Sequence, residues 1–531
     1  MAITVTETPT DANGAHANGK VIVNASGHGH ATGHATAAFT EARLAKPPSA
    51  HLLQYDLIPL LEREKKQFDQ YLQIDLAHLV MLVEQGIVAR DVGRALLPAL
   101  SDLRKRGAAG VNIDPAKGSM LLQIEGTLAA ALGEDIAGNL HTGRSRIDQG
   151  ATARRLFKRN VLLEILNAVA TLEETLIKTA KRHPGNLIPT YTHLQQAQPG
   201  HFAHYLLGYA DRLHDDFQRC SDAFARANRS PLGCVGLSGT SWPIDRQRTR
   251  ELLGFDDIVL SSRLAREAYY AAEIASSLAF VMATLNDLAT DLHIWSSIEF
   301  GFIQLDDGYC STSSIFPQKK NPVALEVIKY GAGPAVNWGG SALAAFRGEG
   351  SGDQAVRKVP ELDAAFDKTI AMLDLAGGIV STLTVNSDRV QKTLHESWST
   401  TSNLADELVR KNGLSFRQAH HVVARLVRIC EVQGIARAGV TPAVLSQAAF
   451  ETLGQPLDGW TAEELSASLD PVAFVQTRIS EGSIGPEQLA KLTAVAEQRV
   501  KGDRMWLQNK KDQIALAASK LDAAIVSIVE G

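Results

Sequence analysis

The sequence contains few of the features that mark small secreted or membrane-bound proteins. Only four cysteines occur in 531 residues, Cys220, Cys234, Cys310 and Cys430, and their wide spacing fits neither a zinc knuckle nor a disulfide framework. No apolar run approaches the ~20 residues of a membrane span, and the first residues lack the basic and apolar regions of a signal peptide. We therefore expect a soluble, cytoplasmic protein.

Aromatic residues and net charge are also scarce. Aromatic residues make up 6% of the chain and apolar residues 45%, mostly Ala, Leu and Val, a composition typical of close-packed helices. The net charge is −5, and the sequence contains no block of residues of like charge. This balance argues against nucleic acid or a membrane surface as a partner and favours small molecules.

The first 46 residues differ in composition from the rest of the chain. They are rich in Ala, Gly, Thr, Asn and His, and they contain too few large apolar side chains to offset the entropy of ordering. We predict a disordered tail. Its residues His28, His30 and His34 leave two interpretations open, a metal site or a low-complexity polar segment, and the composition favours the second.

Long stretches without helix breakers dominate the middle of the chain. Apolar residues recur at helical spacing over 150–183, 202–228 and 265–298, and a fourth pattern begins at Pro322. Helices this long and this evenly apolar are hard to bury in a monomer, so we expect a bundle whose faces are shared between subunits.

The fold class predicted is all-α, with three helical domains around a long central helix bundle. Shorter helical patterns precede the bundle, and after Glu396 glycine and proline reappear. The predicted divisions are the tail over 1–46, an N-terminal helical domain over 47–147, the central bundle over 148–395 and a C-terminal helical domain over 396–531.

Three polar loops interrupt this helical background. The first, residues 141–149, reads HTGRSRIDQ and brings two guanidinium groups and two hydroxyls to the start of a helix. That arrangement predicts an anion site. The alternative is an ordinary capped helix with solvated arginines.

The second and third loops carry groups suited to acid–base chemistry. Residues 190–199 read TYTHLQQAQP, in which His193 lies among amides that can fix its tautomer. Residues 311–322 read STSSIFPQKKNP, and with Asn321 as N-cap before Pro322, Lys319 would lie near the positive end of a helix. A structural histidine and a capped helix behind a solvated basic loop are the alternatives.

The three loops together resemble the argininosuccinate lyase family of the fumarase/aspartase superfamily. The third is similar to the superfamily signature GSSxMPxKxN, and the first two to the family stretches HTGRSRNDQ and THLQRAQP. Further similarity extends through 231–246 and 404–420 to 470–475. The resemblance implies a homotetramer whose active sites each combine loops from three subunits. It also implies release of fumarate from an N-substituted aspartate by β-elimination, with no metal or organic cofactor.

The resemblance also implies roles for individual residues. Ser313 matches the base, which must be stabilised as an alkoxide, and Lys319 matches a cation beside the anionic intermediate. His193 matches the residue that orients substrate or protonates the leaving nitrogen, and Glu326 the acid that holds it. The substrate-binding residues it implies are Ser145, Arg146, Thr192, Gln195, Ser314 and Asn321.

Several departures from the family pattern cluster where the amine half of the substrate would bind. Ile147 replaces an asparagine, and Thr312 and Phe316 replace the signature glycine and methionine. The stretch over 346–362 lacks the family run that grips the arginine part, and a histidine-containing acidic stretch before the first loop is missing over 120–125. We therefore expect a carbon–nitrogen lyase with an altered amine site. The alternatives are argininosuccinate lyase proper and an inactive structural relative.

Overall fold

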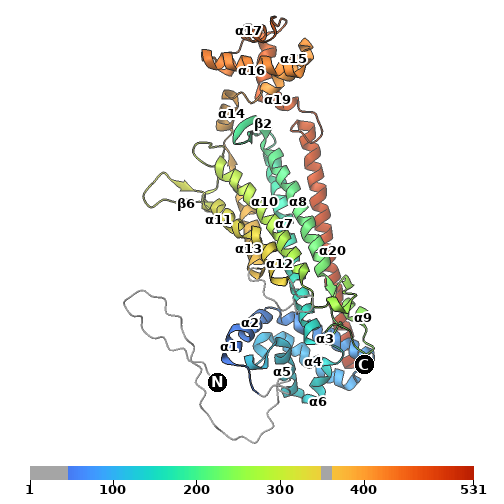
Figure 1. Cartoon of the computed structure of the whole chain (residues 1–531). Helices are drawn as coiled ribbons and strands as arrows, with labels where there is room; N and C mark the ends of the chain where they lie inside the picture. Colours follow the sequence, from blue (N-terminus) through green and yellow to red (C-terminus); the bar gives the residue numbers. More distant parts are fainter. Residues whose placement is uncertain (1–45, 348–361) are drawn as a thin grey trace, which may run out of the picture. The chain divides into compact units, whose positions relative to one another are not determined.

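The computed structural model describes residues 46–347 and 362–531 (Figure 1). The predicted tail up to residue 45, and the residues between Arg347 and Leu362, lie outside the described part. The chain divides into two compact units, Met1–Pro47 and Pro48–Gly531, and the second contains every described helix and strand. Within the described residues, no helix has the length and apolar character that a membrane crossing needs.

The predicted long helices are present, which confirms the all-α fold. Helix α7 spans Arg146–Arg182, α8 spans Phe202–Ala227 and α10 spans Tyr269–Trp295. Each lies within a few residues of its predicted range, because proline is absent from all three and glycine nearly so. The bundle also contains α11 Val323–Ala332, α12 Trp338–Phe346 and α13 Leu362–Thr382.

The last helix packs on the bundle although its sequence range follows the C-terminal helices. Helix α20, Pro486–Glu530, contacts α7 and α8, and further along it contacts α3, Phe68–Glu84, and α4, Arg90–Arg106. Its Val500 and Leu507 join the apolar core of the bundle, whereas Leu521 and Ile528 join the N-terminal core. The limits of the three predicted domains stay predictions.

Two smaller groups of helices have cores of their own. The N-terminal group also contains α1 Ala50–Leu52, α2 Ile58–Lys65, α5 Met120–Leu132 and α6 Glu134–Ala137, with α9 Arg246–Leu253 packed against it. The C-terminal group contains α15 Thr401–Asn412, α16 Phe416–Gln433, α17 Pro442–Leu453 and α18 Ala462–Leu469. Before it, α14 Ser387–Glu396 adds Val390 and Leu394 to the core of the bundle, and after it comes α19 Pro471–Gln476.

The described strands form four two-stranded ladders, and two of these ladders support the predicted loops. Antiparallel β1 Leu187–Thr192 and β2 Gln195–His201 carry the second loop, and antiparallel β6 Ser311–Thr312 and β7 Lys320–Asn321 carry the third. The others are parallel β3 Arg229–Ser230 with β4 Asp257–Ile258, and antiparallel β5 Ile303–Gln304 with β8 Thr384–Val385.

Candidate active site

The first polar loop ends in a capping box at the start of α7. The Ser145 Oγ accepts a hydrogen bond from the backbone N–H of Ile147 at 3.3 Å, and Asp148 Oδ1 accepts one from the backbone N–H of Ser145 at 2.8 Å. Arg146, in the first turn, is exposed. A hydroxyl and a guanidinium group therefore lie at the positive end of a long helix, where an anion is favoured.

Arg144 is not part of this anion site, which corrects the expectation that two guanidinium groups would share it. Its Nη1 donates to Asp75 Oδ1 at 2.6 Å, and both side chains are fully buried. The amide of Gln149 donates to the same oxygen at 2.7 Å. Because a buried charge requires a paired counter-charge, Arg144 fixes the loop to α3 and leaves Arg146 to face solvent.

Asp148 anchors the same loop to a second segment of the chain. Its Oδ2 accepts hydrogen bonds from the backbone N–H groups of Gly233 and Val235 at 2.8 and 2.9 Å. Burial raises the pKa of Asp148 to about 6, although its backbone donors act in the opposite direction. No role for Asp148 was expected from the sequence. Its place three residues after an N-cap serine was the available signal.

The segment over 120–125 contains a buried acidic residue, Glu125. Glu125 Oε1 lies 2.7 Å from His141 Nδ1 and 4.0 Å from Arg144 Nη2. Glu125 thus connects the segment over 120–125 with the first residue of the loop.

His193 lies at the tip of the β1–β2 hairpin. Thr192 pairs with Gln195, so that His193 and Leu194 are the two central residues of the turn, with φ values of 56° and 57°. A type I′ turn requires positive φ at both positions and normally places Asn and Gly there. Non-glycine residues in this region cost about 1 kcal/mol or more each, and such strain is frequent at functional sites. Thr192, His193 and Gln195 are all exposed.

Ser313 accepts two backbone hydrogen bonds within the third loop. Its Oγ lies 3.3 Å from the amide nitrogen of Ile315 and 3.0 Å from that of Phe316. Both N–H groups point at the atom that must carry negative charge if Ser313 is to act as a base, and preorganised donors stabilise such a charge. Ile315 and Phe316 are 73% and 52% exposed, and the next residue, Ser314, is also exposed. Figure 1 shows the loop projecting beyond β6.

The two lysines of the third loop have different environments. Lys320 donates to the Leu305 carbonyl at 2.7 Å and pairs with Asp307 at 2.5 Å. The Lys319 side chain is exposed, and within the described ranges no hydrogen bond or ion pair holds it. Of the two neighbouring ammonium groups, Lys319 is therefore the one left for an anionic ligand.

Asn321 is not the N-cap of α11, contrary to the sequence-based expectation. Pro322 occupies the cap position and the helix begins at Val323. Asn321 instead pairs with Ser311 across the β6–β7 ladder, and its Nδ2 donates to Ser311 Oγ at 3.4 Å. Glu326, in the first turn of α11, is exposed.

The three loops are separated within one chain. Helix α7 contains 37 residues, which corresponds to a length of about 55 Å, with the first loop before it and the hairpin of His193 after it. Across the described residues, no hydrogen bond or ion pair joins one of the three loops to another. Within one chain, therefore, no hydrogen bond or ion pair among the described residues unites the loops, and the roles predicted for their residues stay predictions.

The comparisons with known proteins agree with the fold. Residues 64–336 match a family model described as Lyase, and residues 398–476 match one described as Argininosuccinate lyase C-terminal. Together with the long-helix bundle, these matches define an enzyme of the fumarase/aspartase superfamily of lyases. More narrowly, the chain belongs to the argininosuccinate lyase family, which confirms the resemblance seen in the sequence.

Curated relatives match over nearly their whole length. Argininosuccinate lyase of Methanocaldococcus jannaschii is 33% identical over 443 residues, which cover 83% of this chain and 90% of that protein. Argininosuccinate lyase of Methanosarcina acetivorans is 33% identical over 493 residues, covering 92% and 97%.

Solved structures show the same architecture. EDDS lyase in complex with formate has a TM-score of 0.82 at 30% identity, covering 91% of this chain and 97% of that one. A variant of EDDS lyase with bound fumarate gives the same TM-score and identity, covering 92% and 97%. A class II fumarase from Schistosoma mansoni, at 14% identity and a TM-score of 0.61, shares the fold alone.

Proposed function

We propose that this protein is a carbon–nitrogen lyase that releases fumarate and an amine from an N-substituted aspartate, or catalyses the reverse addition. The observation that carries the proposal is the environment of Ser313, whose Oγ already accepts two backbone N–H groups. A serine hydroxyl is too weak a base unless its alkoxide is stabilised, and these donors supply part of that stabilisation.

In the proposed reaction the Ser313 alkoxide removes the proton from the carbon beside the β-carboxylate. The electron pair of the broken C–H bond is first held as an aci-carboxylate, for which Lys319 and Asn321 supply a cation and an amide donor. The pair then forms the C=C bond of fumarate while the C–N bond breaks. His193, oriented by Glu326, delivers the proton that the leaving nitrogen takes up.

The carboxylates of the substrate require donors on both sides of the reacting carbons. Ser145 and Arg146, at the positive end of α7, form one binding group. The exposed hydroxyl and amide groups of Thr192 and Gln195 on the hairpin form another, and Ser314 of the third loop adds a further hydroxyl. The fumarate bound in the EDDS lyase variant supports a dicarboxylate as the shared part of the ligand.

Such a site requires a homotetramer, because the loops of one chain are too far apart. Several large apolar side chains along α10, α11 and the segment that follows them are exposed in the single chain, and their burial would favour association. They include Phe280, Val327, Tyr330 and Val336, which are 54%, 46%, 82% and 70% exposed. Mixing Ser313→Ala chains with His193→Asn chains after mild dissociation should restore activity that neither variant has alone. Unrestored activity in mixed tetramers would contradict a shared site.

The amine half of the substrate is proposed to differ from that of argininosuccinate. Ile147, half-buried in the first turn of α7, has no side-chain donor for a carboxylate. Arg347 is exposed and donates to the Ala344 carbonyl at 3.3 Å, while Arg357 and Lys358 lie outside the described residues. Whether these three cations select an amine that carries an anionic group stays a prediction.

The second candidate is argininosuccinate lyase itself, which the 33% identical relatives favour. The two are separated by measuring kcat/KM for argininosuccinate beside fumarate addition to neutral, cationic and anionic amines, following fumarate by absorbance. We expect argininosuccinate to be a poor substrate because unpaired polar groups lower affinity and discrimination. A value of roughly 10⁴ M⁻¹s⁻¹ or more for argininosuccinate would establish the second candidate instead. Failure of every substrate in the panel would favour an inactive structural relative.

A further inference from the structure

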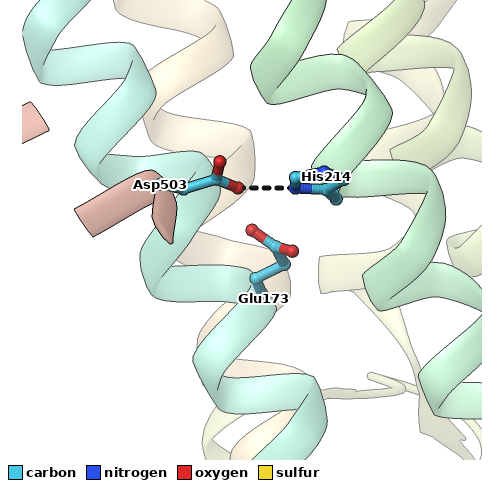
Figure 2. Close-up of side chains that lie close together, drawn as sticks. All are labelled: Glu173, His214 and Asp503. Carbon is cyan, nitrogen blue, oxygen red and sulfur yellow. Dashed lines mark hydrogen bonds and ion pairs between the residues drawn. The ribbon is translucent and has the colours of Figure 1, made fainter. Parts of the chain in front are cut away.

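Three ionisable side chains meet in the bundle, outside the three polar loops. Glu173 comes from α7, His214 from α8 and Asp503 from α20, and one ligand atom of each lies within 4.8 Å of the others. Glu173 and Asp503 are 1% and 3% exposed. Figure 2 shows the Glu173 carboxylate directed towards the pair formed by His214 and Asp503. Three helices thus bring one nitrogen and two carboxylate ligands to a common point.

Glu173 is the unsatisfied member of this cluster. Its Oε2 is buried and forms no hydrogen bond with any described residue. Asp503, by contrast, accepts hydrogen bonds from His214 Nδ1 at 2.8 Å and from Gln218 Nε2 at 3.0 Å. Burying an ionised carboxylate without a partner is costly, so the position of Glu173 favours a bound cation that the protein itself does not supply.

The neighbouring cations are committed elsewhere. Arg499 forms an ion pair with Asp211, and Arg504 pairs with Glu174 at 2.8 Å. When ionised, the four carboxylates of this region carry four negative charges, whereas its two guanidinium groups carry two positive charges. The carboxylates are those of Asp211, Glu174, Glu173 and Asp503, and the guanidinium groups those of Arg499 and Arg504. The local excess of negative charge matches one divalent cation.

We propose that Glu173, His214 and Asp503 bind one divalent transition-metal ion of the zinc type. A mixed set of one imidazole nitrogen and two carboxylate oxygens suits such ions, whereas Mg²⁺ and Ca²⁺ prefer oxygen ligands alone. Ligand atoms around a tetrahedral ion lie about 3.3 Å apart, so the 2.8 Å contact between His214 and Asp503 needs to open only slightly. Gln218 acts as a positioning residue that orients Asp503.

Access to the site is open from one side. A cavity of about 550 Å³ is lined by His214, Gln218, Asp503 and Trp506 among others, which leaves room for an entering ion and for water at its remaining coordination positions. The bound ion would link α20 to α7 and α8. Its expected effect is on the stability of the bundle, and it takes no part in the proposed elimination.

The test uses the full chain with His16, His28, His30 and His34 of the tail replaced by Gln, so that tail histidines do not contribute to metal binding. After removal of metals with a chelator, Zn²⁺ binding is measured by calorimetry and the thermal midpoint is recorded with and without Zn²⁺. We expect one equivalent of Zn²⁺ per chain and a higher midpoint in its presence. Mg²⁺ and Ca²⁺ should cause neither effect.

Variants in that background locate the site. Glu173→Gln and Asp503→Asn should each weaken Zn²⁺ binding by about 100-fold and abolish the midpoint shift, and Gln218→Leu should weaken it by about tenfold. The matched control is Glu164→Gln, which removes the same charge from an exposed position of α7 away from the cluster and should leave binding unchanged. If either Glu173→Gln or Asp503→Asn fails to fold, the other variant tests the proposal. Absence of Zn²⁺ binding in the background chain, or equal affinity in Glu173→Gln, overturns the proposal.

Discussion

The first and third polar loops are held in place in different ways. The first is fixed by its own chain, because Arg144 and Asp75 form a fully buried ion pair beneath it and Asp148 ties it to a neighbouring segment. The third is exposed, and Ser313 is held only by two backbone N–H groups of the same loop. Substitutions in the buried part of the first loop should therefore act mainly on stability, and substitutions in the third loop mainly on catalysis.

The largest effect is expected at Ser313. Ser313→Ala deletes the proposed proton acceptor and little volume, so it should lower kcat by about 10³-fold or more while the free energy of unfolding changes by less than about 0.5 kcal/mol. Steady-state kinetics on the best substrate of the panel and urea unfolding measure the two quantities. Gln318→Ala, an exposed change in the same loop, is the control and should change kcat little. Activity of Ser313→Ala within about tenfold of the parent would exclude Ser313 as the base.

Breaking the buried Arg144–Asp75 ion pair should lower stability, in contrast to the effect expected on kcat at Ser313. Arg144→Met leaves the Asp75 carboxylate buried without its partner, which typically costs about 3–5 kcal/mol of stability. Replacing both residues in an Arg144→Met, Asp75→Leu chain should recover part of that loss. Arg146→Met, on the exposed side of the same loop, should keep stability and raise KM. A stable Arg144→Met protein in urea unfolding would show that the pair does not anchor the loop.

A buried histidine of α3 that contacts the first loop, His78, should make stability depend on pH. Its Nε2 contacts the Thr142 carbonyl at 2.8 Å, and burial and the nearby Arg144 lower the pKa of His78 to about 3 from an ordinary 6.5. The unfolded chain takes up this proton near pH 6.5 but the folded chain does not. Stability is therefore complete above pH 6.5 and falls as the pH drops towards 3.

The size of this effect can be isolated with His78→Gln. Between pH 6.5 and pH 5 the parent should lose roughly 2 kcal/mol through this group, and the variant should not show that loss. Urea unfolding at several pH values gives the difference between the two proteins, in which other titrating groups largely cancel. Parallel curves for parent and variant would contradict the assignment.

The smallest effect is expected at the hairpin tip. Leu194→Asn places a residue that tolerates positive φ in the strained position next to His193, and should stabilise the protein by less than about 1 kcal/mol. Calorimetry measures the stability change of the variant. Gln196→Asn in β2 is the control and should not increase stability. A loss of stability would mean that the exposed Leu194 side chain packs against something the single chain does not provide.

Local sequence was sufficient wherever structure depends on neighbouring residues. The spans of α7, α8 and α10 follow from apolar spacing and from the scarcity of helix breakers, and Ser145 begins α7 because its side chain caps nearby N–H groups. The three polar loops could also be located from the sequence, since each is a short motif with local turn chemistry, while the roles of their residues stay predictions. The amino-acid order thus determined the helices, the family and the groups available for chemistry.

Tertiary structure decided which of those groups are free to act. The sequence showed two equivalent arginines in the first loop, and only the position of Asp75 on another helix withdrew Arg144 from solvent. From the sequence, Asn321 was expected to be an N-cap, but Asn321 pairs with Ser311 and α11 begins at Val323. Similarly, Glu173 and Asp503 are 330 positions apart in the numbering and meet only because α20 packs against α7 and α8. Contacts between distant segments have no periodic signal in the sequence, because they depend on how whole helices pack.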